Sequence, residues 1–257
     1  MSGAVAIELA RFDAFLFDLD GVITRTADLH ALAWKKLFDE YLSARSAALG
    51  TAMTPFDILT DYRAHVDGKP RSAGVRDFLA SRNVRLPEGT PQDDESRESV
   101  QGLGKRKNRY FLALLKQEGV RVYSSAIRLV REARSLGVRT AVVSSSRSTA
   151  TVLRVARLTD LFEVRVDGVE RARLALPGKP DPATFLEAAR RLGVRPERSV
   201  VFEDATSGVE AGRRGGFGFV VGVGGPEQAD GLRQHGADVV VADLAAILLI
   251  PRGSGRS

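Results

Sequence analysis

Two acidic pairs stand directly after apolar runs and could together hold a cation. Asp18 and Asp20 follow the run 14–17, and Glu203 and Asp204 follow the run 199–202. Residues two apart on a strand point the same way, so the first two carboxylates would repel each other unless a cation lay between them. Oxygen ligands of this kind suit Mg²⁺. An acidic turn for the first pair, and a helix N-cap by Asp204, are the alternatives.

Two further clusters could bind phosphate. Ser144, Ser145 and Ser146 end the apolar run 138–143, and hydroxyl and N–H groups at a strand-to-helix turn bind phosphate oxygens. Lys179 stands in Gly-Lys-Pro-Asp-Pro, just before a helical pattern, where its ammonium can neutralise a phosphate or an attacking carboxylate. Helix capping by the serines and a solvated turn lysine are the plainer alternatives. The order of these acidic, serine and lysine clusters along the chain is a more specific indication of function than any one cluster alone.

Alternating strand and helix patterns would bring these clusters together. Short apolar runs predict buried strands at 14–17, 138–143, 162–166, 199–202, 217–223 and 237–241. Helical patterns lie between them, at 124–136, 182–192 and 205–214. This alternation predicts an α/β fold, a Rossmann-like parallel-sheet core with helices on both faces, which binds ligands at the carboxyl ends of its strands.

The stretch 27–118 breaks that rhythm, because helical patterns fill it and no strong strand pattern does. These helical patterns lie at 29–42, 56–65, 75–81 and 106–118, and the polar stretch 87–99 predicts an exposed loop. We therefore expect an inserted helical cap domain at 27–118 and an α/β catalytic core made of residues 1–26 and 119–257. We expect the tail, 251–257, to be mobile.

Composition narrows the classes of function. The 257 residues are 44% hydrophobic and include no cysteine, which excludes disulfides and thiolate metal sites and favours a cytoplasmic location. We expect no signal peptide and no membrane span. A net charge of +6 raises the question of nucleic acid, but the arginines are scattered and only 105–109 is densely basic. We expect no nucleic-acid or membrane partner, and a monomer or weak dimer.

The run 17–24, Phe-Asp-Leu-Asp-Gly-Val-Ile-Thr, followed by Thr26, His30 and Trp34, resembles the haloacid dehalogenase (HAD) superfamily of phosphotransferases. Within it, the chain resembles the β-phosphoglucomutase-like subfamily, over residues from about 12 to 245. The resemblance implies that Asp18 is the nucleophile that becomes an aspartyl phosphate. It also implies that Asp20 is the general acid and base.

The same resemblance implies binding roles for the remaining residues. Mg²⁺ would be held by the Asp18 carboxylate, the Asp20 backbone carbonyl and Asp204, with Glu203 close by. Lys179 would contact both phosphate and Asp18. The other phosphate- and substrate-binding positions that it implies are Thr26, His30, Trp34, Gly68, Arg71, Lys107, Asn108, Ser144, Ser145 and Ser146. Among these, His30 and Lys107 match positions tied to cap closure, and Arg71 matches the arginine that clamps the distal phosphate.

Four positions depart from the subfamily pattern. Asp67 stands where a lysine is expected, and Arg25 replaces an acidic residue after Thr24. Arg147 and Ser148 stand where a lysine and an asparagine are usual. These departures leave the reaction class intact, but they lie at positions that would contact the sugar and select the substrate.

We therefore predict an intramolecular phosphotransferase that converts β-D-glucose 1-phosphate to glucose 6-phosphate through an aspartyl phosphate and glucose 1,6-bisphosphate. A magnesium-dependent sugar-phosphate phosphatase is the first alternative, and it differs in using water as the acceptor. A cap that excludes water and an arginine that holds a second phosphate favour the mutase. An inactive sugar-phosphate-binding module is the second alternative, and the intact set of acidic, serine and lysine residues argues against it.

Overall fold

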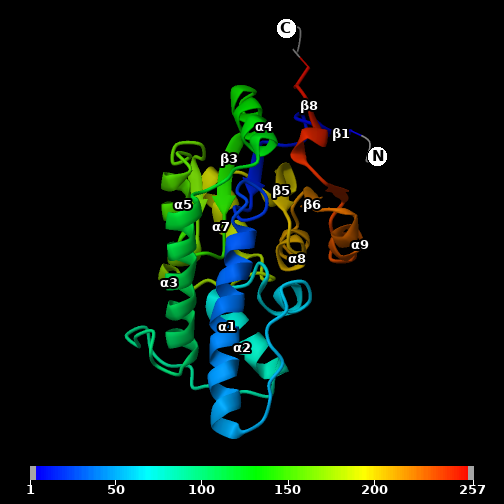
Figure 1. Ribbon diagram of the computed structural model, residues 1–257. Coiled ribbons are helices and arrows are strands. Elements are labelled where there is room, and N and C mark those ends of the chain that lie inside the picture. Colours follow the sequence, from blue (N-terminus) through cyan, green and yellow to red (C-terminus); the bar gives the residue numbers. More distant parts are fainter. Residues whose placement is uncertain (1–3, 254–257) are drawn as a thin grey trace. The chain divides into compact units, whose positions relative to one another are not determined.

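The computed structural model describes residues 4–253. Contacts divide the chain into two compact units, one made of Met1–Arg25 and Arg121–Ser257 and the other of Thr26–Val120 (Figure 1). Of the predicted mobile tail, residues 254–257 lie outside the described part, whereas Arg252 donates hydrogen bonds to the carbonyls of Leu9 and Phe12. Within residues 4–253 no helix has both the length and the apolar character needed to cross a membrane.

The first unit is built on a six-stranded parallel sheet, in the order β4-β3-β2-β5-β6-β7. Its strands are β2 (Ala14–Phe17), β3 (Arg139–Val143), β4 (Val164–Val166), β5 (Ser199–Glu203), β6 (Phe219–Val223) and β7 (Val239–Val241). Phe17 pairs with Val142 on one side and with Phe202 on the other, so β2, β3 and β5 end at the same edge of the sheet. The predicted α/β parallel-sheet fold is confirmed.

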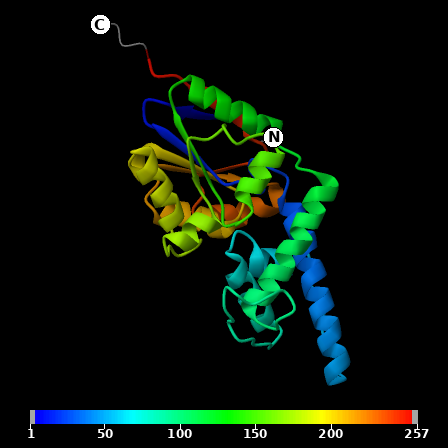
Figure 2. The same cartoon turned by 90° about the vertical axis from the view of Figure 1, so that its left-hand side faces the viewer.

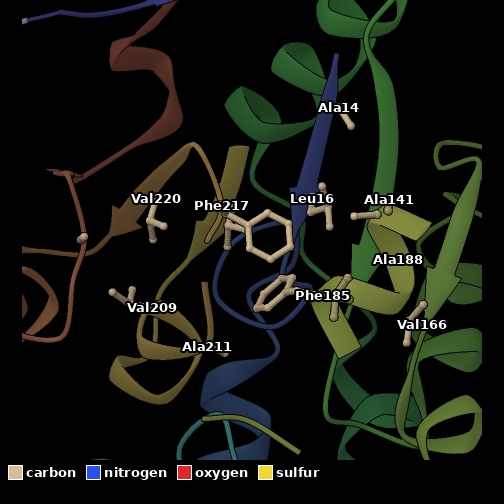
Figure 3. Packing of buried hydrophobic residues seen from close by; sticks show 14 of the residues in the cluster. Ala14, Leu16, Ala141, Val166, Phe185, Ala188, Val209, Ala211, Phe217 and Val220 are labelled. Atoms are coloured by element: carbon tan, nitrogen blue, oxygen red, sulfur yellow. The ribbon is translucent and has the colours of Figure 1, made fainter. Parts of the chain in front are cut away.

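Helices cover the sheet and bury its apolar runs. They are α4 (Ser124–Ser135), α5 (Thr149–Val155), α6 (Gly168–Arg173), α7 (Ala183–Leu192), α8 (Thr206–Arg214) and α9 (Pro226–Gln234). Phe185 of α7 and Val209 of α8 pack with Leu16 of β2 in one buried cluster (Figure 3). Alternate strand residues point to opposite faces, so Phe17 and Phe202 lie on the other face, where their rings stack 4.5 Å apart.

Two strands were not predicted from the sequence. β1 (Val5–Glu8) and β8 (Ile247–Ile250) form a separate two-stranded parallel sheet. Each has only four residues, and each finds its partner at the opposite end of the chain, so neither carries a clear local signal. The short helical turns η2 (Pro196–Arg198) and η3 (Leu244–Ala246) complete the described elements of this unit.

The second unit is helical. It comprises α1 (Ala27–Leu49), the π-helical turn η1 (Tyr62–Val66), α2 (Arg71–Ser81) and α3 (Val100–Glu118). The long helices α1 and α3 pack against each other (Figure 1 and Figure 2). The helix predicted at 56–65 is confirmed only in its second half, because the helical residues begin at Asp61. Asp57 accepts hydrogen bonds from the N–H groups of Leu59 and Thr60, which favours a turn there.

Candidate active site

Asp18 occupies the first position after β2. Its N–H donates to the Phe202 carbonyl at 2.9 Å, which continues the pairing with β5 by one residue. The chain then turns tightly, since the Gly21 N–H donates to the Thr24 carbonyl and Thr24 Oγ1 donates to the Leu19 carbonyl at 3.1 Å. Asp18 is 6% exposed, so its carboxylate lies in a largely buried setting at the edge of the sheet.

Lys179 bridges the two acidic strand ends. Its ammonium lies 2.5 Å from Asp18 Oδ1 and 2.7 Å from Glu203 Oε2, and the side chain is buried against the Phe185 ring. Burial alone would lower the pKa of Lys179, but Asp18 and Glu203 outweigh burial and raise it. The lysine therefore stays charged between two carboxylates.

The environment of Asp18 carries more negative charge than Lys179 offsets. Burial and the neighbouring Glu203 carboxylate raise the pKa of Asp18 well above its usual value, against the opposing effect of Lys179. Carboxylate oxygens of Asp18, Glu203 and Asp204 lie within 4.8 Å of one another. A divalent cation is attracted to such a cluster and would lower the pKa of Asp18 again. The residues present therefore fit a magnesium ion.

Within this cluster Glu203 has a different setting from Asp204. Both oxygens of Glu203 accept hydrogen bonds, one from Lys179 and the other from the Ala205 N–H at 3.2 Å. The side chain is fully buried, and a β-carbon on Gly208 would lie 2.1 Å from its Cδ. Glu203 thus orients Lys179, whereas the half-buried Asp204 is the better candidate for a direct metal ligand.

Asp20 faces the serine turn that follows β3. Ser144 Oγ donates to Asp20 Oδ2 at 3.3 Å and accepts from the Ser146 N–H at 3.0 Å. The Ser146 carbonyl in turn accepts from Thr149 Oγ1, and Ser145 lies half-buried between the two neighbouring serines. The serine cluster predicted to bind phosphate therefore lies beside the predicted acid and base.

In the helical unit, the half-buried His30 lies in one group with the buried residues Trp34 and Lys107. The Lys107 ammonium contacts His30 Nδ1 and lies 4.9 Å from the centre of the Trp34 ring. Phe111, one turn after Lys107 on α3, stacks on His30 with ring centres 3.9 Å apart and planes 10° apart. Thr26 precedes α1 and is fully buried, and its carbonyl accepts the His30 N–H.

The predicted phosphate clamp, Arg71, begins α2 and reaches across to α3. Its Nη2 donates to Asn108 Oδ1 at 2.7 Å. A β-carbon on Gly104 would lie 3.2 Å from Arg71 Cδ, so a glycine lets the arginine stem lie close to the helix. Gly68, with φ 66°, supplies the left-handed turn that leads into α2. The structure thus gathers Arg71 and Asn108 in one place.

Structural partners are found for Arg25, one of the unusual positions, and for Lys69, which lies two residues after the unusual Asp67. Lys69 donates to Asp77 Oδ2 at 2.8 Å, and this contact connects the turn before α2 to the helix itself. The Arg25 guanidinium lies 4.9 Å from the centre of the Tyr123 ring, in the first unit. It packs on the surface of that unit, and this contact gives Arg25 a structural role.

Three residues that contact predicted site residues within their own unit received no role from the sequence. Gly21 lies inside the recognised motif, and Gly208 follows the acidic pair among small residues, a pattern that indicates close packing. Phe111 stands four residues after Lys107, so both lie on the same face of α3. That spacing was the available signal for an aromatic residue supporting the His30 cluster.

Comparison with known proteins gives similarities over most of the chain. The sequence model of the haloacid dehalogenase-like hydrolase family matches residues 12–216. A protein of Mycobacterium bovis named beta-phosphoglucomutase is 49% identical over 238 residues, which cover 91% of each chain. An uncharacterized glycosyl hydrolase of Mycobacterium tuberculosis is 41% identical over 95% of this chain, but over only 18% of its own length. The solved structure of beta-phosphoglucomutase from Clostridium difficile has a TM-score of 0.68 at 25% identity, covering 91% of this chain and 92% of that one.

Proposed function

Because the chain belongs to the haloacid dehalogenase-like hydrolase family, we propose that it is a phosphomutase converting β-D-glucose 1-phosphate to glucose 6-phosphate through glucose 1,6-bisphosphate. The observation that carries the proposal is the buried Asp18–Lys179 pair beside Asp204 at the carboxyl edge of the sheet. The choice of acceptor is supported by the 49% identical protein named beta-phosphoglucomutase. We further propose that the enzyme works in the cytoplasm.

In this proposal Asp18 attacks phosphorus and Lys179 supplies positive charge. A carboxylate and a phosphate dianion repel each other, so the site must offset negative charge before they can react. Lys179 is fixed by Glu203 and stays protonated, so it can contact the transferred group and Asp18 together. Mg²⁺ held by Asp18, Asp204 and the Asp20 carbonyl would add charge stabilisation and keep the Asp18 carboxylate ionised.

Asp20 and the serine turn complete the transfer. Asp20 protonates the departing sugar oxygen and then removes a proton from the next acceptor hydroxyl, as a general acid and base. Ser144 donates to Asp20 in the structure, and its hydroxyl can donate to a phosphoryl oxygen instead once substrate is bound. The backbone of Ser145 and the side chain of Ser146 are proposed to hold the same phosphoryl group.

The helical unit is proposed to contact the sugar and its second phosphate. Arg71 is the proposed clamp for the phosphate that is not being transferred, because a guanidinium binds phosphate through two parallel hydrogen bonds. Asn108 holds Arg71 in place through the 2.7 Å hydrogen bond. His30, Trp34 and Lys107 are proposed substrate contacts, and Thr26 and Gly68 are proposed to shape their approach. An acceptor sugar held in this way competes with water for the aspartyl phosphate.

A sugar-phosphate phosphatase is the second candidate, supported by the family description as hydrolases. It would use the same nucleophile, lysine and acidic cluster, with water in place of the second sugar hydroxyl.

One assay separates the two candidates. The protein receives Mg²⁺, β-glucose 1-phosphate and a trace of glucose 1,6-bisphosphate, and both glucose 6-phosphate and free phosphate are followed. The mutase predicts glucose 6-phosphate at the rate of substrate loss, with little free phosphate. Free phosphate released at that rate would overturn the mutase and favour the phosphatase. Asp18→Asn serves as the inactive control and should give neither product.

A further inference from the structure

His30 and Phe111 form the closest ring stack among the described residues. Their ring centres are 3.9 Å apart and the planes differ by 10°, whereas Trp34 and Phe38 stack at 5.2 Å. The centres of aromatic rings in contact usually lie 4.5–7 Å apart. The His30 imidazole therefore lies closer to the phenyl ring than is usual, and nearly parallel to it. Phe111 is fully buried, and it therefore offers His30 a rigid surface.

Lys107 contacts the same imidazole at its edge. Its ammonium meets His30 Nδ1 and lies 5.2 Å from the centre of the Phe111 ring. The lysine is 3% exposed, so this contact is made away from bulk water. Phe111 and Lys107 are one turn apart on α3, and the helix presents both side chains to the one histidine on α1.

The chemistry of this contact decides where the histidine proton lies. A lysine ammonium has three donors and no acceptor, so a protonated Lys107 requires Nδ1 of His30 to be the acceptor, without a proton of its own. His30 is then a neutral imidazole with its proton on Nε2, and that nitrogen can only donate a hydrogen bond.

We propose that Phe111 is a positioning residue that, together with Lys107, fixes His30 as a neutral imidazole protonated at Nε2. Lys107 selects the tautomer, and the stacked phenyl ring keeps the imidazole in the plane in which Nδ1 meets the ammonium. Where the proposed mutase function holds, His30 serves the substrate as a hydrogen-bond donor and not as a base. The tautomer itself does not depend on that function.

The test is a nitrogen NMR measurement on the full chain labelled with ¹⁵N-histidine, at pH 7. The sequence has three histidines, so His65→Gln and His235→Gln assign the signals of His30. We expect His30 to show a single neutral form with Nδ1 unprotonated. Lys107→Met should convert it to an average of the two tautomers. A proton on Nδ1 in the wild type, or an unchanged spectrum in Lys107→Met, overturns the proposal.

Phe111→Leu tests the positioning role, with Phe78→Leu as the matched control. Both phenylalanines are fully buried in the helical unit, so both variants lose similar packing, but Phe78 does not stack on His30. We expect only Phe111→Leu to bring the averaged His30 signal and to lower kcat for the sugar phosphate about tenfold, with aryl phosphate hydrolysis unchanged. Equal effects of the two variants on the His30 spectrum would show that Phe111 is only a core residue. The spectrum decides this even if the wild type proves to be a phosphatase.

Discussion

Gly21 lies directly against Asp204, so closely that a β-carbon on Gly21 would be 1.8 Å from Asp204 Oδ2. Gly21 also has φ 94°, a conformation that residues with a side chain rarely adopt. The two residues follow β2 and β5, which are neighbours in the sheet. The missing side chain of Gly21 therefore allows the Asp204 carboxylate to approach Asp18, and the candidate cation site depends on it.

Gly21→Ala should displace the Asp204 carboxylate and weaken magnesium binding. We expect the Mg²⁺ concentration for half-maximal activity to rise at least tenfold, measured by titrating Mg²⁺ against initial rate. Gly216→Ala is the matched control, because Gly216 has φ 70° with nothing within 4 Å of its β-carbon position. An alanine at either position carries a similar backbone strain of about 1–2 kcal/mol, but at position 216 the new side chain contacts no carboxylate. The same magnesium dependence in both variants would contradict this role for Gly21.

Lys179→Met should destabilise the fold as well as abolish activity. The substitution leaves Asp18 and Glu203 buried without their cation, and breaking a buried ion pair in this way costs about 3–5 kcal/mol. Denaturant unfolding measures the loss. Adding Glu203→Gln removes one of the two buried carboxylates that have lost their lysine partner. The double variant should therefore recover part of the free energy of unfolding, but no activity. A loss below about 1 kcal/mol in the single variant would show that the buried ion pairs do not stabilise the fold.

Arg71→Ala should reduce mutase turnover more than it reduces hydrolysis of a small aryl phosphate. An aryl phosphate has no second phosphate for the arginine to hold, so only the mutase reaction loses a contact. We expect a loss of about 100-fold in kcat/KM for the sugar phosphate, which corresponds to a charge-assisted contact of about 3 kcal/mol. Arg76→Ala, an exposed arginine on the same helix, is the control. Equal losses for both substrates would contradict a clamp.

A cluster of arginines on α6 and α7 makes stability depend on pH. Arg173 and Arg191 lower the pKa of Glu170 to about 2, and Arg190 and Arg191 lower the pKa of Glu187 to about 2, from 4.5 in each case. The carboxylates of Glu170 and Glu187 therefore bind protons more weakly in the folded state than in the unfolded chain. The ionised Glu170 and Glu187 make their full contribution to the free energy of unfolding above about pH 4.5, and this contribution is lost as the pH falls towards 2.

The double variant Glu170→Gln/Glu187→Gln tests this contribution. We expect it to be less stable than the wild type at pH 7 and to lose less stability between pH 5 and pH 2.5. Thermal unfolding across that range measures both effects. Glu132→Gln, on α4, changes a carboxylate outside the cluster and should follow the wild-type curve. A double variant with the wild-type pH dependence would mean that the cluster does not stabilise the fold.

The sequence predicts best those elements whose own residues carry the signal. β2 and β5 are buried on both faces, so each is a continuous apolar run. α1 was predicted to end near Leu42, its last buried apolar residue, yet it continues to Leu49 through alanines that favour a helix. The helical pattern predicted at 56–65 overlaps the π-helical turn η1, but its periodicity indicates neither where the helical turn begins nor that it is π-helical.

The candidate site divides in the same way. Asp18, Asp20 and Asp204 could be placed together from the sequence, because parallel strands end at one edge of a sheet. The contact of Lys179 with Asp18 was expected only from the family resemblance, and its second contact, with Glu203, was not expected, because it depends on the loop that enters α7. The stack of Phe111 on His30 joins two helices far apart in the chain, and only the folded helical unit reveals it.

The most direct test of the account follows the phosphoryl group itself. The enzyme is mixed with glucose 1,6-bisphosphate that carries labelled phosphorus, and samples are quenched in acid before and after a chase with unlabelled β-glucose 1-phosphate. Each sample is digested, and the peptide and residue that carry the label are identified. The proposed mechanism predicts label on Asp18 that passes into sugar phosphate during the chase. Label on another residue, or label that leaves Asp18 only as free phosphate, would contradict it.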